Sequence, residues 1–140
     1  MITIQQEKMR RGFEKFHIRG LPFNAVIHTF SVTDNGVIHD HPFAFTTHIL
    51  KGSYIERIYQ GVDASGTVLF EEIKRETGSS HRVEASCIHE LIALPDGDCW
   101  TIITPENWER EPGFWKFDQQ GGWFRQHNKR KFRLLMTRPL

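Results

Sequence analysis

The 140 residues carry 18 basic and 17 acidic side chains, a formal net charge of +1, so charge gives no reason to expect nucleic acid or an anionic membrane as partner. A chain of this length predicts a single domain over residues 1–140 with one sizeable core. No apolar run of roughly 18 residues occurs and the N-terminus is polar, so we expect no membrane span, no secretory signal and a cytoplasmic location.

The first predicted element is a short N-terminal helix over residues 3–16. Thr3 is a candidate N-cap for this helix. Gly12 lowers the helix propensity, so we expect the helix to end early. Apolar side chains follow the cap at mixed spacing: Ile4, Met9, Phe13 and Phe16.

From about residue 23 the sequence changes to short strands separated by turns. Asn35-Gly36 is a strong hairpin signal, because both residue types tolerate a positive φ. Pro42 interrupts the strand that follows this turn. Such spacing is typical of an all-β sandwich or barrel, and a closed barrel can enclose a ligand cavity. The predicted strands cover 24–32, 37–50, 53–59, 67–75, 81–85, 90–94, 99–104 and 132–137, and a Trp- and Gly-rich segment fills 105–131.

Two histidines after the hairpin turn are the first candidates for chemistry. Residues two apart in a strand share a face, so His39 and His41 project together and could bind one metal ion. His81 opens a later extended segment and is the predicted third ligand, which would leave open positions for water or substrate. The alternative is that His39 and His41 are polar strand-end residues bonded to backbone or to Asp40, which points the other way and is expected to be structural.

Two further histidines are candidates for a fourth ligand. His48 is out of phase with His41, so it joins the site only if a bulge near Pro42 shifts the register. His89 has no motif support, and a surface or packed position is expected for it. The predicted metal ligands are therefore His39, His41 and His81, with His48 as the fourth.

A ligand pocket is expected beside these histidines. Phe43, Phe45 and Tyr54 are predicted to line it. Arg82 is a further candidate, since a guanidinium binds carboxylate or phosphate in a bidentate way, but it could equally be a surface charge.

Part of the chain, residues 36–81, resembles the cupin superfamily. The first cupin motif begins with His-x-His and ends with a Gly, which His39, His41 and Gly52 match. The position of the usual carboxylate ligand holds Phe45, which leaves a three-histidine site as the alternative. Cupin thiol dioxygenases use three histidines on iron.

The second cupin motif has a Gly, two residues and a His. Gly78 and His81 match it, with Glu76 where a Pro is usual. A narrower resemblance is to small bacterial and phage cupin-like proteins with His-Asp-His-Pro-Trp, His-Arg and Trp-Thr-Leu blocks in this order. The blocks that match lie at 39–45, 49–54, 81–84 and 100–104, with Trp115.

The resemblance implies a single-domain cupin-type double-stranded β-helix, or jelly-roll barrel, with the short helix before it. It further implies one divalent transition metal, and an imidazole set suits Fe, Ni, Zn, Mn or Cu. The function expected is metal binding with a small-molecule ligand, and an enzyme of this kind would be dioxygenase- or isomerase-like. A homodimer is implied by the resemblance only.

Two other classes of function stay open. The first is a metal-free sugar- or small-ligand-binding module, in which the histidines donate hydrogen bonds or act as a general base. The second is a phage or bacterial accessory interaction domain that uses its aromatic C-terminal part as an interface. Those aromatic residues could also build the core of the barrel. They are Trp100, Trp108, Phe114, Trp115, Phe117, Trp123 and Phe124.

Overall fold

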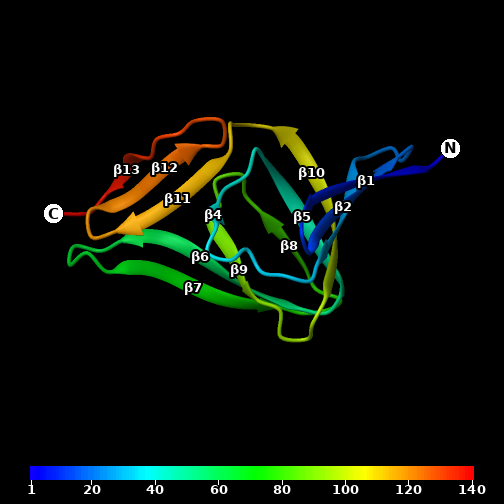
Figure 1. Cartoon of the computed structure of the whole chain (residues 1–140), viewed down its shortest axis with the longest axis horizontal. Coiled ribbons are helices and arrows are strands. Elements are labelled where there is room, and N and C mark those ends of the chain that lie inside the picture. Colours follow the sequence, from blue (N-terminus) through cyan, green and yellow to red (C-terminus); the bar gives the residue numbers. More distant parts are fainter.

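A computed structural model describes all residues 1–140 as two antiparallel sheets without a helix (Figure 1). The six-stranded sheet has the order β1 (Thr3–Arg10), β2 (Phe13–Arg19), β3 (Ala25–Phe30), β10 (Cys99–Trp108), β5 (Phe43–Lys51) and β8 (Ser80–Val83). The seven-stranded sheet has the order β13 (Arg133–Thr137), β12 (Gly121–Gln126), β11 (Gly113–Asp118), β4 (Ile38–His39), β9 (His89–Ala93), β6 (Tyr54–Val62) and β7 (Val68–Arg75). The all-β architecture expected from the sequence is confirmed.

The N-terminal segment is a hairpin, so the helix predicted over residues 3–16 is wrong. Strand β1 pairs with β2 from Thr3 opposite Arg19 to Arg10 opposite Phe13. Every residue of β1 is exposed, so a helix here would have had no core against which to bury an apolar face. Gly12, with a φ of +82°, forms the turn between the two strands instead of ending a helix. The structure has no helix long and apolar enough to cross a membrane.

The turn that leads to the histidine pair has the predicted positive φ values, but the predicted hairpin is wrong, because β3 and β4 lie in different sheets. Asn35 and Gly36 have φ values of +51° and +82°, and Asn35 is the only non-glycine residue with a positive φ. The backbone N–H of Val37 donates to the carbonyl of Asp34 across this turn. The short strand β4 follows immediately, so the turn fixes where His39 enters the sheet.

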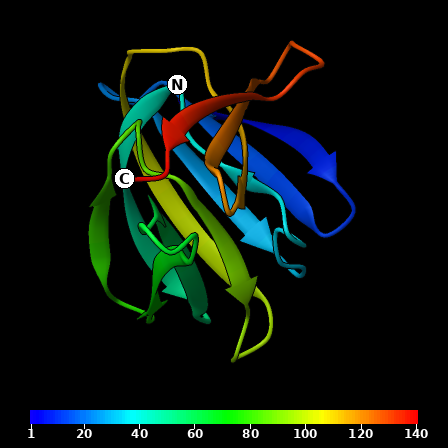
Figure 2. The same ribbon diagram turned by 90° about the vertical axis from the view of Figure 1, so that its left-hand side faces the viewer.

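All the strands predicted from residue 24 onward are present, with shifted ends. The central strands β3, β10 and β5 run side by side in Figure 2, as their registers require. The Trp- and Gly-rich segment is more regular than expected, because β10 continues to Trp108 and the hairpin of β11 and β12 follows.

Part of the C-terminal aromatic block is buried. Trp115 and Phe124 pack with Ile88, and Trp115 lies on the face of the seven-stranded sheet opposite to His39, because its partner in β4 is Ile38. Trp100 and Trp108 are exposed. Residues in the later part of the aromatic block are therefore buried, and its first two tryptophans are exposed to solvent.

Candidate metal-binding pocket

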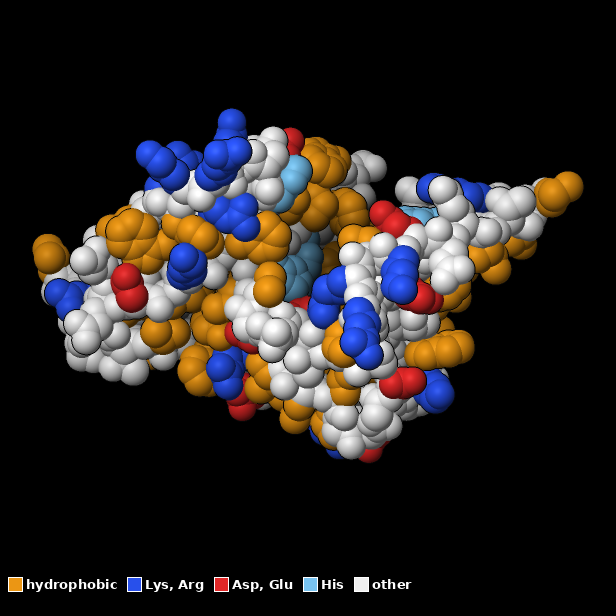
Figure 3. Space-filling model, viewed as in Figure 1, with side chains coloured by type: hydrophobic (Ala, Val, Ile, Leu, Met, Phe, Trp, Pro, Cys, Tyr) orange, Lys and Arg blue, Asp and Glu red, His pale blue; other side chains and the backbone are white.

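A cavity of about 380 Å³ opens between the two sheets. His39, His41 and His89 line one side of it, and Phe43 and Phe45 form part of its apolar surface. Figure 3 shows pale-blue histidine side chains in a hollow near the centre of the molecule. The cavity thus combines aromatic and aliphatic side chains with convergent polar groups, which is the usual character of a small-molecule site.

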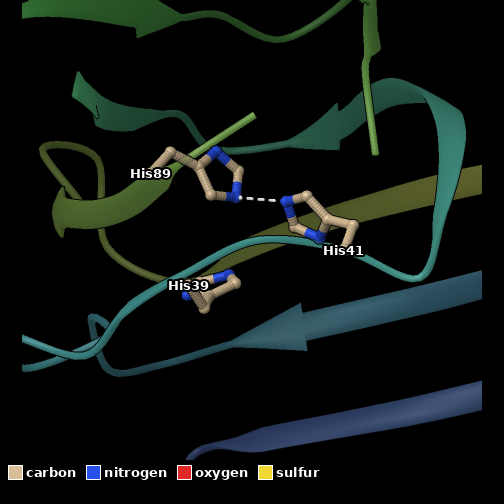
Figure 4. Close-up of side chains that lie close together, drawn as sticks. All are labelled: His39, His41 and His89. Atoms are coloured by element: carbon tan, nitrogen blue, oxygen red, sulfur yellow. Dashed lines mark hydrogen bonds between the residues drawn. The ribbon is translucent and has the colours of Figure 1, made fainter. Parts of the chain in front are cut away.

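Three imidazoles converge in this cavity (Figure 4). His39, His41 and His89 each offer one ring nitrogen, and these three atoms lie within 4.8 Å of one another. The Nε2 atoms of His41 and His89 are 3.0 Å apart. Two nitrogens on one tetrahedral zinc ion, at bonds of about 2.0–2.1 Å, would lie about 3.3 Å apart, so this separation fits a shared metal ion.

Strand pairing brings the triad together from positions far apart in the sequence. His39 of β4 and His89 of β9 are direct partners across the antiparallel ladder, so their side chains share one face. His41 lies two residues beyond, where its backbone N–H donates to the carbonyl of Ala85. The ring centroids of His39 and His41 are 5.3 Å apart, as the predicted shared face requires.

Asp40 fixes the segment between the two histidines. Its side chain points away from theirs and is buried. The backbone N–H of Gly113 and the indole N–H of Trp115 donate to it at 2.7 and 2.9 Å, and the guanidinium of Arg110 lies 2.6 Å away. The predicted structural role of Asp40 is thereby confirmed, and it ties β4 to β11 of the same sheet.

Hydrogen bonds select the tautomers of two of the histidines. The Nδ1–H of His39 donates to the carbonyl of Val37 at 3.1 Å, and that of His89 donates to the carboxylate of Glu56 at 2.8 Å. In the neutral rings the Nε2 atoms then carry the lone pairs that a metal ion would bind, and in the structure the Nε2 of His89 shares a hydrogen bond with the Nε2 of His41. Pairing of the second ring nitrogen with a carbonyl or carboxylate is the usual arrangement for metal-binding histidines.

Two of the three imidazoles, those of His39 and His41, are held in the neutral form. Burial, followed by the neighbouring His89 and His39, lowers the pKa of His41 to about 2. Burial and then His89 also lower the pKa of His39. Metal ligation needs neutral imidazoles, so the electrostatics of the pocket suit a cation and disfavour protons.

Glu56 connects the triad to a second group of polar residues. Its side chain is almost completely buried, at 1% exposure. Burial raises the pKa of this carboxyl, but hydrogen bonds from His89 and from Arg75, at 2.7 Å, outweigh burial and lower the pKa overall. Glu56 therefore stays ionised and orients His89.

His81 belongs to this second group and not to the triad. The hydroxyl of Tyr54 lies 3.2 Å from its Nε2, and Glu56 Oε1 lies 3.6 Å from the same atom. His81 sits on β8, which pairs with β5 in the opposite sheet from β4 and β9. His81, the third ligand predicted from the sequence, therefore contacts Glu56 and Tyr54. His89 is the residue that lies beside His39 and His41.

The remaining predicted site residues divide between the cavity and the surface. Phe43, Phe45 and Tyr54 line the cavity. His48 faces outward and bonds Ser80 at 2.6 Å, since β5 pairs with β8 in regular register from Phe45 to His48. Arg82 also lies outside the cavity, because it alternates with inward-facing neighbours on β8, and its guanidinium binds Glu106 at 2.8 Å.

His89 is the residue that sequence reasoning missed. The spacing of the cupin motifs directs attention to His81, eight residues earlier in the chain. The pairing of β4 with β9 brings His89 into the site. The contact between His41 and His89 joins residues that are 48 positions apart in the sequence. In the sequence His89 lies directly before the strand predicted over residues 90–94, whereas in the structure it is the first residue of β9.

Comparisons with known proteins give a fold and no closer relationship. No model of a known protein family matches the sequence, and no curated protein matches it. Hydroxypropylphosphonic acid epoxidase from S. wedmorenis is similar with a TM-score of 0.54 and 15% identity, over 74% of this chain and 55% of that chain. A cupin-2 domain from Rhodospirillum rubrum is similar with a TM-score of 0.52 and 12% identity, over 79% of this chain and 73% of that chain.

These similarities define the class of fold. The two sheets and the histidine-lined cavity between them form a cupin-type barrel. This chain spans only about half the length of the epoxidase that it matches.

Proposed function

We propose that this chain is a cupin-type metal-binding protein, in which His39, His41 and His89 hold one divalent transition metal and the adjoining cavity binds a small molecule. The observation that carries the proposal is the convergence of three imidazoles, whose ring nitrogens lie within 4.8 Å of one another, on a cavity large enough for a small ligand. Three protein ligands leave coordination positions open, as catalytic metal sites require.

The residues around the triad have distinct tasks in this proposal. Glu56 fixes the ring of His89 with Nε2 toward the cavity, and Asp40 holds the backbone between the other two ligands. Phe43 and Phe45 restrict water in the cavity. A divalent ion bound there would supply Lewis-acid or redox chemistry to a small substrate.

Among the candidate metals, iron has support from a structural neighbour. A solved structure of the hydroxypropylphosphonic acid epoxidase is described as its Fe(II) form, and its TM-score to this chain is 0.53. An all-imidazole donor set also suits Ni, Zn, Mn or Cu. A dioxygenase- or isomerase-like reaction is part of this proposal, and cytoplasmic location and homodimer formation remain predictions.

Elemental analysis tests the proposal. Tag-free protein, as purified and after incubation with Fe(II), Ni, Zn, Mn or Cu(II), is compared with the double variant His39→Ala/His41→Ala. His48→Ala is the matched control, because His48 faces away from the cavity. We expect close to one metal per chain in the parent and the control, and none in the folded double variant. Absence of metal from the parent under all conditions would contradict the proposal.

A second candidate function has a specific observation in its favour. His89 and Glu56 form a buried imidazole–carboxylate pair at 2.8 Å, the arrangement in which a carboxylate orients a general base. In a metal-free cupin-type pocket, His89 could then move a proton to or from a bound sugar or similar ligand.

The two candidates differ in their response to a chelator. Metal-dependent activity or ligand binding is lost with EDTA and restored by one metal. Activity of a metal-free His89–Glu56 pair survives EDTA and is lost in Glu56→Gln.

A further inference from the structure

The wall of the cavity formed by the six-stranded sheet carries a row of polar side chains. Lys15 of β2 pairs with His28 of β3, and His28 pairs with Thr101 of β10. Direct partners in adjacent strands share a face, and all three residues line the cavity that contains the histidine triad. This row does not belong to the proposed metal site.

Lys15 is the cationic side chain of this cavity. It forms no ion pair, whereas Glu7, its partner on β1, binds His17 at 2.8 Å. Its Nζ lies 5.8 Å from the centroid of the Phe13 ring, on the cavity side of β2. Burial lowers the pKa of the Lys15 ammonium, and the charge of Glu7 acts more weakly in the opposite direction.

His28 contributes a second unused polar group. Its Nε2 is buried and has no hydrogen-bond partner. Phe13 and Phe30 pack edge-on against its ring, at centroid distances of 5.4 and 5.8 Å. An unpaired buried nitrogen is costly in a folded protein, and a hydrogen bond to a bound ion or water is one of the ways in which that cost is removed.

The other charged group of the cavity is already compensated. Asp34 accepts hydrogen bonds from the backbone N–H of Leu91 at 2.7 Å and from Arg10 at 3.3 Å. Lys15 is therefore the charge in this cavity that lacks a partner. In Figure 3, blue cationic side chains lie next to the hollow that holds the pale-blue histidines.

We infer that Lys15 and His28 form an anion subsite, so that the cavity takes a small molecule with a carboxylate or phosphoryl group at one end and a metal-binding oxygen at the other. The anionic group binds at the wall of the six-stranded sheet, and the remainder of the molecule faces His39, His41 and His89. Only the metal-binding end of this ligand rests on the proposed function. The anion subsite at Lys15 and His28 does not depend on a metal ion. A cavity of about 380 Å³ limits the ligand to a small molecule.

Calorimetric titration of the zinc-loaded protein tests this subsite. The probes are 4-hydroxybutyrate, 3-hydroxypropyl phosphate and the uncharged 1,4-butanediol. We compare the parent with Lys15→Met, with His28→Phe, and with Lys8→Met as the matched control, because Lys8 is on the same hairpin but outside this cavity. Thermal unfolding and zinc content are measured for each variant.

We expect at least one of the two anions to bind the parent roughly tenfold or more tightly than the diol, a difference of about 1.4 kcal/mol. Lys15→Met should lose this preference, His28→Phe should weaken it, and Lys8→Met should retain it. The anion that binds more tightly decides between carboxylate and phosphoryl ligands.

Equal binding of the anions and the diol, or an unchanged preference in Lys15→Met, would overturn the subsite. Failure of the proposed function is a separate outcome, because it appears as absence of zinc from the parent. In that case the same titrations on metal-free protein still compare Lys15→Met with the parent and decide the subsite.

Discussion

Glu56 is the residue through which the triad and its surroundings are coupled. It accepts hydrogen bonds from His89 and Arg75, and it is nearly inaccessible to solvent. A carboxylate in this position fixes the tautomer of a metal-binding histidine and makes the ring more basic. The cupin pattern has a carboxylate ligand at the position of Phe45, and in this chain the carboxylate nearest to the triad is Glu56, which binds His89.

Replacement of this carboxylate should weaken metal binding without removing a ligand. Glu56→Gln is expected to lower zinc affinity by about 10- to 100-fold, measured by competition with a chelator. Glu72→Gln is the control, since Glu72 pairs with Arg57 on an exposed surface. Equal zinc affinity of Glu56→Gln and the parent would show that the carboxylate does not orient His89.

His28 predicts a dependence of stability on pH. Burial, with a smaller effect of Lys15, lowers its pKa to about 3. The unfolded chain takes up a proton on this ring below about pH 6.5 and the folded chain does not, so the free energy of unfolding decreases as the pH falls. Between pH 7 and pH 5 the loss from His28 is about 2 kcal/mol.

Urea unfolding of metal-free parent and His28→Gln at both pH values measures this loss. The variant should lose about 2 kcal/mol less than the parent over this interval, because all the other histidines are common to both proteins. Identical losses would mean that His28 is protonated in the folded state.

At the level of elements, the turn at Gly52 is held by a close backbone approach. Its φ is +73°, and a Cβ at this position would lie 2.4 Å from the carbonyl oxygen of Asp98. The strands β5 and β6 meet at this turn, beside the loop before β10. Gly52 also matches the last glycine of the first cupin motif, and the structure gives that glycine a physical reason.

Gly52→Ala should therefore be more harmful than a substitution at a glycine with a similar backbone. Gly97 has a φ of +80°, but a methyl group added there would enter open space. Gly97→Ala should cost about 1–2 kcal/mol from the left-handed backbone alone, and Gly52→Ala should cost clearly more. Chemical denaturation measures both, and equal losses would exclude the contact with Asp98 as a cause.

Local chemistry explains which elements could be predicted. The turn at Asn35-Gly36 follows from the preference of these residues for a positive φ, and the strands after it follow from strand propensity. Both are properties of short segments, so the sequence is enough to predict them. The N-terminal hairpin was missed because the apolar spacing of residues 3–16 allows a helix, while the pairing of β1 with β2 determines the outcome. Tertiary pairing overrides weak helix propensity here.

At the level of the whole molecule, the site depends on which strands lie side by side. The sequence predicted the shared face of His39 and His41, since this follows from strand geometry. It did not predict His89, because the pairing of β4 with β9 is a property of the complete barrel. For the same reason His81 is in the opposite sheet, next to Tyr54.

Metal binding should stabilise the entire barrel. A ligand at 1,000 times its Kd adds about 4 kcal/mol to the free energy of unfolding, which for a chain of this size raises Tm by on the order of 10 °C. EDTA should reverse the increase, as measured by calorimetry. The variant His39→Ala/His41→Ala should show neither the increase nor the reversal. An equal increase in parent and variant would place the metal elsewhere.

The most direct measurement is zinc affinity, by chelator competition, of His89→Ala and His81→Ala beside the parent. If His39, His41 and His89 are the ligands, His89→Ala should lose at least about 100-fold in affinity, and His81→Ala, which changes only a neighbour of Glu56, should lose about tenfold or less. Strong loss in His81→Ala with parent-like affinity in His89→Ala would contradict the triad and return the third ligand to the position that the cupin motif indicates.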